Sequence, residues 1–250
     1  MRNRQFLQGL LILLCAALAL VLIGRYTALD LYLADAMFDF AAMRFPWQEH
    51  WFYAGFMHHT MKALMMGVAL APAVALLVDR FTSLTLLDKR TRSILLLVTA
   101  SALLIPLTIS LLKAVSIHHC PWSLARYGGF APYLRLFDSL PPGVPAGHCF
   151  PAGHASSGLW LGSAAAFFLP GRPGKAFAAF LIGILPGLAL GLGQQMRGAH
   201  FLTHTLWSAW IAALLILVLA RLLVDASPAA HGAPAAPTRA QGDAAPRLIQ

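Results

Sequence analysis

Basic side chains and imidazoles are concentrated in two polar stretches that interrupt long apolar runs. The residues of interest are Lys113, Arg126, Gly153, His154 and Ser156 in the first stretch, and Arg197, His200 and His204 in the second. Imidazoles serve as nucleophiles and as proton donors, and the planar arginine fork binds two oxygens of a phosphate. Ionisable groups held close to a bilayer are costly and usually functional. These stretches therefore indicate a site where histidines act on an anionic group.

Metal binding is an alternative use of the same histidines. His200 and His204 are four residues apart, a spacing that suits a metal ion on one face of a helix. The sequence has no H-E-x-x-H motif, and the candidates for a third ligand are generic. We therefore expect no metal and no other cofactor. In a purely structural interpretation, Lys113 and Arg197 anchor helix ends at the membrane surface, and His154 only begins a helix.

The composition excludes an ordinary soluble domain. Of 250 residues, 59% are hydrophobic and only 11% are charged, whereas a soluble domain has about a quarter charged residues. The net charge of +9 could suggest nucleic acid binding, but the basic residues form short clusters between apolar runs. This is the pattern of a membrane protein, so we expect membrane lipids and no nucleic acid as partners.

The apolar runs predict an all-α fold with six transmembrane helices, because about 20 residues span the hydrocarbon core. The expected spans are residues 6–23, 61–78, 93–112, 156–169, 176–194 and 203–223. The first span is expected to be a retained helix and not a cleaved signal. The short fourth span should extend backwards into the polar stretch before it. The aromatic segment 25–60 is expected to hold an interfacial helix, and residues 226–250 a disordered cytoplasmic tail.

The basic clusters also predict the orientation. With six spans, the clusters near residues 2–4, 80–92, 172–175 and 221–247 share one side, which should be the cytoplasm. Both termini would then be cytoplasmic. The two polar stretches would lie on the opposite face, which is the periplasm if the protein is in a bacterial inner membrane.

Three motifs resemble the signature of the type 2 phosphatidic acid phosphatase superfamily of membrane phosphatases. Lys113 followed after six residues by Cys120 and Pro121 resembles the first motif, K-x6-R-P. The segment P-A-G-H at residues 151–154 resembles P-S-G-H. The segment R-G-A-H-F-L-T-H at residues 197–204 resembles S-R-x5-H-x3-D. The resemblance implies a phosphatase domain over residues 1–225, with core motifs in residues 113–207.

Each of the three motifs departs from the family pattern. Cys120 replaces the arginine of the first motif, and Ala152 replaces the serine of the second. In the third motif, Gln194 stands at the arginine position and His204 replaces the aspartate. The resemblance therefore keeps the two central histidines but implies an altered phosphate cradle.

The resemblance assigns roles to the remaining residues. It implies that His200 is the nucleophile that forms a phosphohistidine and that His154 is the general acid. His204 would orient His200 in place of the aspartate. Lys113 and the backbone amides around Gly153 would bind the phosphoryl oxygens. Arg197 and Arg126 are candidates for the missing arginines, and Ser156 for the missing hydroxyl.

The implied function is hydrolysis of a phosphorylated lipid, either a phosphomonoester or a pyrophosphate, at the outer face of the membrane. A lipid phosphotransferase is an alternative, as is a non-catalytic protein of the same fold that binds or transports lipid phosphates. Cys120 and Cys149 both lie in the stretch expected to face an oxidising compartment. A disulfide between them would join the segments of the first two motifs and would explain the cysteine that replaces arginine.

Overall fold

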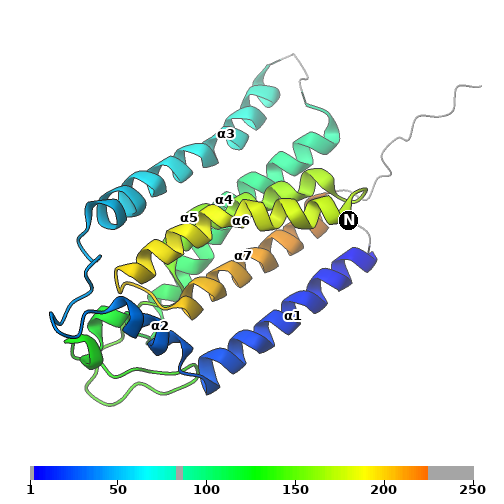
Figure 1. Ribbon diagram of the computed structural model, residues 1–250. Helices are drawn as coiled ribbons and strands as arrows, with labels where there is room; N and C mark the ends of the chain where they lie inside the picture. Colours follow the sequence, from blue (N-terminus) through cyan, green and yellow to red (C-terminus); the bar gives the residue numbers. More distant parts are fainter. Residues whose placement is uncertain (1–2, 83–86, 225–250) are drawn as a thin grey trace, which may run out of the picture.

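The computed structural model describes residues 3–82 and 87–224, so the predicted tail over 226–250 lies outside the described residues. Within these ranges the fold is all-helical, as predicted, and contains no strand. The elements in chain order are α1 (Asn3–Tyr26), α2 (Leu29–Met37), η1 (Trp51–Thr60), α3 (Met61–Phe81), α4 (Lys89–Ala114), η2 (Pro121–Ser123), η3 (Ala125–Tyr127), α5 (Gly153–Leu159), η4 (Trp160–Phe168), α6 (Pro173–Met196) and α7 (Leu202–Leu223) (Figure 1).

Five helical segments in the described part are long and apolar enough to cross a membrane: α1, η1 with α3, α4, α6 and α7. The second of these begins ten residues before the predicted start at residue 61. Residues 51–60 form a π-helix that runs directly into α3. The last ten residues of the segment expected to be interfacial therefore belong to the long helix. The His50 side chain caps the start of this helix by accepting from the Phe52 N–H (3.3 Å).

The predicted fourth span is built differently from the others. It begins at Gly153, as its expected backward extension requires, and it consists of α5 followed by the unusually long 3₁₀ helix η4. Because a 3₁₀ helix rises about 2.0 Å per residue and an α-helix about 1.5 Å, the two together are about 28 Å long. At the far end, Arg90 donates to the carbonyls of Phe167 (3.0 Å) and Leu169 (2.7 Å). The segment thus runs from the end of α4 back to its beginning.

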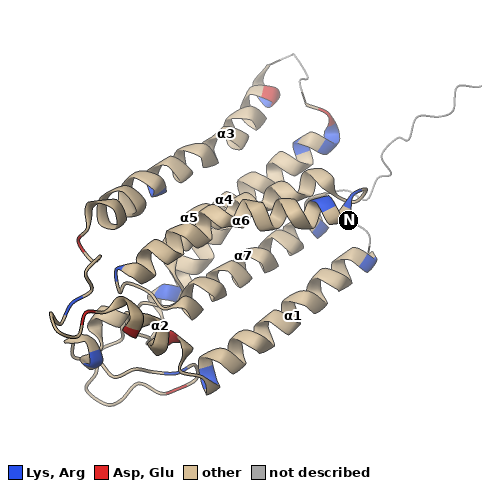
Figure 2. Ribbon diagram, in the orientation of Figure 1, with Lys and Arg blue, Asp and Glu red and all other residues tan. Residues whose placement is uncertain are grey.

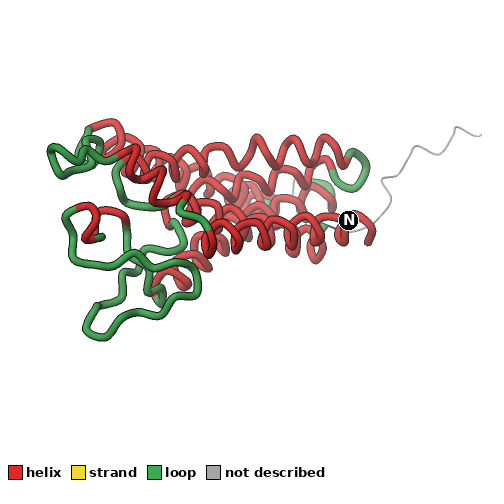
Figure 3. The backbone as a smooth tube through the Cα atoms, turned by 60° about the horizontal axis from the view of Figure 1, so that its bottom comes forward, coloured by secondary structure: helices red, strands yellow, loops and turns green. Residues whose placement is uncertain are grey.

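The two ends of the bundle differ in character. Charged residues lie mostly towards the ends of the bundle, with few along the helices (Figure 2). One end holds the N-terminus of α1, where Gln5 donates to the Pro170 carbonyl (2.9 Å) and Asn3 accepts from Arg221 (3.2 Å). The other end holds the long loops and the short helices α2, η2 and η3 (Figure 3). The polar stretches of the sequence lie at this second end, which we call the loop end.

Glycines bring α6 close to its neighbours. A Cβ atom at Gly187 would lie 2.6 Å from the backbone nitrogen of Leu159 in α5, and one at Gly191 would lie 2.3 Å from Cγ2 of Thr205 in α7. Small residues of this kind let membrane helices approach to backbone distance. Helix α6 is therefore held between α5 and α7, which brings the segments of the second and third motifs together.

A carboxylate from α2 fixes the start of α7. Phe201, at the N-cap of α7, offers no side-chain cap. Asp30, which is 6% exposed, instead accepts hydrogen bonds from the N–H (3.0 Å) and the hydroxyl of Thr203. A carboxylate at a helix N-terminus satisfies an unpaired N–H and interacts favourably with the helix dipole. This contact positions the helix turn that carries His204.

Candidate active site

The first two motifs meet at the loop end. Lys113 is half-buried in the last turn of α4, and Gly153 begins α5. A Cβ atom at Gly153 would lie 3.8 Å from Cδ of Lys113, so the lysine stem runs past this glycine. His154 follows in the first turn of α5. Its Nε2 atom is buried and has no hydrogen-bond partner among the residues that the structure describes.

His200 occupies the tight turn between α6 and α7. The turn needs Gly198, whose φ of +72° is in the left-handed region and whose Cα faces the ring of Phe45. His200 is only 4% exposed, and its Nδ1 lies 3.5 Å from Sγ of Cys149. A disulfide sulfur accepts but cannot donate a hydrogen bond. This contact therefore favours the tautomer with the proton on Nδ1, which leaves the lone pair on Nε2 for attack.

The environment of His200 keeps it uncharged. Burial is the main cause that holds the pKa of His200 well below its ordinary value of 6.5, and electrostatic interactions with His204, Lys113 and His154 lower it further. A hydrogen bond with the backbone of Cys149 acts in the opposite direction. An imidazole with a lowered pKa is neutral at pH 7, as a nucleophile must be.

His204 lies one helical turn beyond His200, with 5.7 Å between the ring centroids. It is 4% exposed, and its Nδ1 atom is buried and unpartnered in the described part of the chain. The ring also contacts Phe150 at 5.3 Å. An orienting role for His204 stays a prediction.

Arg197 caps the end of α6 and is held on two sides. Its Nε donates to the Gln48 carbonyl (2.8 Å) and its Nη1 to Oε1 of Gln194 (3.0 Å). Gln194 is 1% exposed, and its Nε2 has no hydrogen-bond partner within residues 3–82 and 87–224. Sequence reasoning did not select Gln194, although its place at the arginine position of the third motif was a usable signal. The structure presents a fixed guanidinium with a buried amide donor beside it.

His58 joins the site from outside the three motifs. Its ring lies 4.0 Å from the ring of His154, at an interplanar angle of 34°. Sequence reasoning left this residue aside, because its only signal was that it shares a helix face with Lys62. The contact arises because η1 and α3 pass next to the start of α5.

Two of the predicted phosphate-binding residues are engaged elsewhere. Arg126 forms a two-pronged ion pair with Asp35 of α2, from Nε (2.7 Å) and from Nη2 (2.6 Å). Among the described residues, this arginine has no hydrogen bond with His154, His200 or His204. The Ser156 hydroxyl donates to the Gly153 carbonyl of its own helix (2.6 Å). The geometry therefore supports neither Arg126 as the replacement for a missing arginine nor Ser156 as the replacement for the missing serine.

Cys120 and Cys149 are joined by a disulfide, with their Cα atoms 5.3 Å apart. The bond connects the segment after Lys113 to the segment before His154, next to His200. Cys149, His200 and His204 present donor atoms within 4.8 Å of one another. A disulfide sulfur is not a thiolate, so the cluster offers a metal ion only its two imidazoles, whereas zinc sites in proteins have three or four protein ligands.

Comparison with known proteins identifies one family. The family model of the PAP2 superfamily matches residues 93–227, which include most of α4 and all of η2, η3, α5, η4, α6 and α7. No curated protein and no solved structure matches the chain. The matched region contains all three motifs, but it leaves out α1, α2, η1 and α3.

Proposed function

The chain belongs to the PAP2 superfamily, and on that premise we propose that it hydrolyses a lipid phosphomonoester or pyrophosphate at the outer face of a membrane. Membership indicates a phosphatase that acts on phosphate esters, which are often lipids. The observation that carries the proposal is the convergence of Lys113, His154 and His200 at the loop end.

The electrostatics of this convergence support an anionic substrate. The charges that act on His154 come from His58, Lys62, Lys113 and Arg197, and all of them are positive or become positive on protonation. Fixed cations around a small site stabilise a phosphoryl group and the charge that develops on its oxygens during transfer. A bound phosphate would supply the negative charge that this group of side chains lacks.

The proposed reaction has two steps. In the first, Nε2 of His200 attacks phosphorus while the bond to the lipid oxygen breaks, and protonated His154 gives its proton to that oxygen. In the second, His154 takes a proton from a water molecule whose oxygen attacks phosphorus, while the bond between phosphorus and Nε2 of His200 breaks and frees the imidazole. The products are inorganic phosphate and a lipid alcohol, or a lipid monophosphate when the substrate is a pyrophosphate. His154 ends the cycle protonated, as it began.

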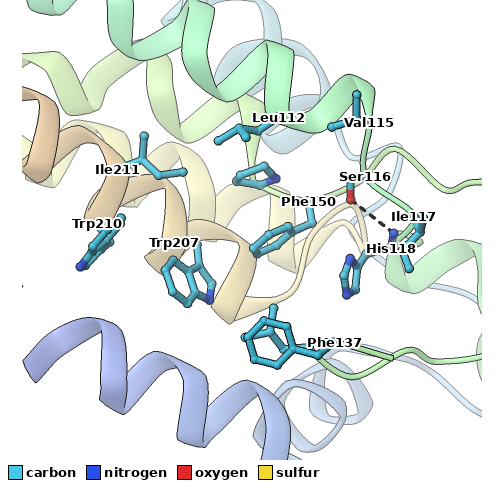
Figure 4. A pocket seen from close by; sticks show the side chains of 12 residues that line it. Leu112, Val115, Ser116, Ile117, His118, Phe137, Phe150, Trp207, Trp210 and Ile211 are labelled. Carbon is cyan, nitrogen blue, oxygen red and sulfur yellow. Dashed lines mark hydrogen bonds between the residues drawn. The ribbon is translucent and has the colours of Figure 1, made fainter. Parts of the chain in front are cut away.

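An apolar pocket next to the site favours a lipid over a small phosphate ester. The pocket has a volume of about 450 Å³ and lies between the end of α4, the start of α7 and the loop end (Figure 4). Its walls include Phe150, Trp207 and Trp210, whose rings face the space in Figure 4. Phe150 contacts the ring of His204 at 5.3 Å. A lipid chain in this pocket would therefore start beside the site.

The proposal includes a six-pass topology with both termini in the cytoplasm of a bacterial inner membrane. It rests on the five long helices, and on the length of about 28 Å of α5 with η4, which is close to a hydrocarbon core of about 30 Å. The end opposite the site contains Arg90, Arg172 and Lys175, so the positive-inside rule places that end in the cytoplasm.

The test is phosphate release from a panel of lipid phosphates and pyrophosphates by the purified protein in detergent. The wild type is expected to release phosphate, and His200→Ala none. Arg126→Ala is the matched control, because its partner Asp35 lies outside the site, and it should retain activity. Adding an acceptor lipid separates hydrolysis from phosphotransfer. A His200→Ala protein as active as the wild type would refute the phosphohistidine mechanism.

A further inference from the structure

The second long helix lies outside the region that the family model matches, yet it borders the site. Its first part, η1, is a π-helix, and such segments are rare and frequently occur at functional sites. Residues 58 and 62 lie on one face, since they are four positions apart across the junction of η1 and α3. Figure 1 shows this junction at the loop end of the bundle.

His58 packs directly on the proposed general acid. Its ring centroid is 4.0 Å from that of His154, with the planes tilted by only 34°. On its other side, Nδ1 of His58 lies within hydrogen-bond distance of Nε2 of His59 (3.3 Å), and His59 is exposed. His58 is therefore held between a surface imidazole and His154. Stacked against one face, the His154 ring cannot rotate freely.

Lys62 shares a cavity with the start of α5. This cavity, of about 360 Å³, is bounded by α3, α4 and α5, and its lining includes Lys62, Gly153 and Ser156. Lys62 lies close enough for its charge to act on both Lys113 and His154. Two lysines whose charges repel each other would be stabilised by an anion between them.

We propose that this helix completes the altered site, with Lys62 as a phosphate-binding residue and His58 as a positioning residue for His154. The inference rests on the proposed function and extends it to residues outside the three motifs. Cys120 and Gln194 stand where the family pattern has two arginines, so two positive charges are missing. Arg197 and Lys62 would supply two positive charges in their place. The ammonium group of Lys62 would bind a phosphoryl oxygen.

Lys62→Met tests the binding role, with Lys62→Arg as the conservative variant and Lys175→Met as the control at the other end of the bundle. Loss of one charge-assisted contact should raise KM and the Kd of orthovanadate about tenfold or more in Lys62→Met. Lys62→Arg should restore most of the affinity, and Lys175→Met should change neither constant. An unchanged vanadate Kd in Lys62→Met would overturn the assignment.

Vanadate binding also separates this inference from the proposed function. A wild type that binds vanadate but releases no phosphate from any lipid would refute hydrolysis. Lys62 would then still be tested by the difference in vanadate Kd between the wild type and Lys62→Met. Release of phosphate by the wild type, with Lys62→Met equal to it in KM and in vanadate Kd, would refute only the role of Lys62.

His58→Ala and His58→Phe test the positioning role. Removing the ring should lower kcat about tenfold with little change in KM, because His154 then samples unproductive orientations. Phenylalanine keeps a flat ring in the stack and should restore most of kcat. The dependence of kcat on pH should be compared between the wild type and His58→Ala as well, since the charges of His59, Lys62 and Arg197 also act on His58. Equal kcat in wild type and His58→Ala, or a loss that phenylalanine does not restore, would overturn positioning by stacking.

Discussion

At the scale of single residues, His200 combines burial with nucleophilic chemistry. A buried imidazole near Lys113 resists protonation, so it keeps the lone pair that attack on phosphorus requires. Cys149 supplies a sulfur at 3.5 Å on the Nδ1 side, where the family pattern relies on a carboxylate. A sulfur stabilises positive charge on the ring less well than a carboxylate, so the phosphohistidine should break down readily.

The lowered pKa of His200 leads to a prediction about pH. Since the pKa falls below 6.5, His200 is neutral throughout the range from pH 8 to 6.5 and becomes protonated only in more acidic solution. The acid loss of activity that belongs to His200 should therefore lie below pH 6.5. NMR titration of ¹⁵N-histidine-labelled protein measures this directly, with His200→Gln to assign the signal. A His200 ring that titrates at or above pH 6.5 would contradict the description of the site.

At the scale of elements, short segments decide how the long helices present their ends. Helix α7 depends on Asp30 of α2 to satisfy its first turn, since it has no cap of its own. Helix α6 depends on Gly187 and Gly191 to lie against α5 and α7. The 3₁₀ helix η4 lengthens a segment that would otherwise be short for a membrane pass.

Asp30→Ala tests the contact between α2 and α7. The substitution leaves the buried N–H and hydroxyl of Thr203 without their acceptor, which should cost about 2 kcal/mol of stability. Thermal unfolding in detergent should show a lower midpoint for Asp30→Ala, with Asp30→Asn between it and the wild type. Activity should fall as well, because the turn that carries His204 loosens. An Asp30→Ala protein as stable as the wild type would show that α7 does not need this cap.

At the scale of the whole molecule, a helical bundle carries a covalently closed loop end. The disulfide joins positions separated by 29 residues and encloses the loop between α4 and α5. A bond of this kind restricts the unfolded chain, and closing a loop of this length contributes about 3–4 kcal/mol in the chain-entropy model. The same bond holds Cys149 against His200. Stability and catalysis should therefore depend on it together.

The double substitution Cys120→Ala with Cys149→Ala tests this dependence. It should lower the midpoint of thermal unfolding and reduce kcat, because both the closed loop and the sulfur beside His200 are lost. Cys15→Ala is the control, since Cys15 is a free, exposed cysteine in α1. Thiol counting on the unreduced wild type should find one reactive cysteine per chain. Three reactive cysteines would contradict the disulfide.

The sequence by itself determined the helical class, most of the spans, and the segments that hold the chemistry. Long apolar runs leave a chain in lipid little choice but helices, and the motif spacing around Lys113, His154 and His200 is local information. Tertiary structure decided the rest, because it depends on contacts between distant segments. Asp35 draws Arg126 away from the histidines across 91 positions of sequence. The π-helix brings His58 onto His154, and only the packed bundle places a disulfide sulfur beside His200.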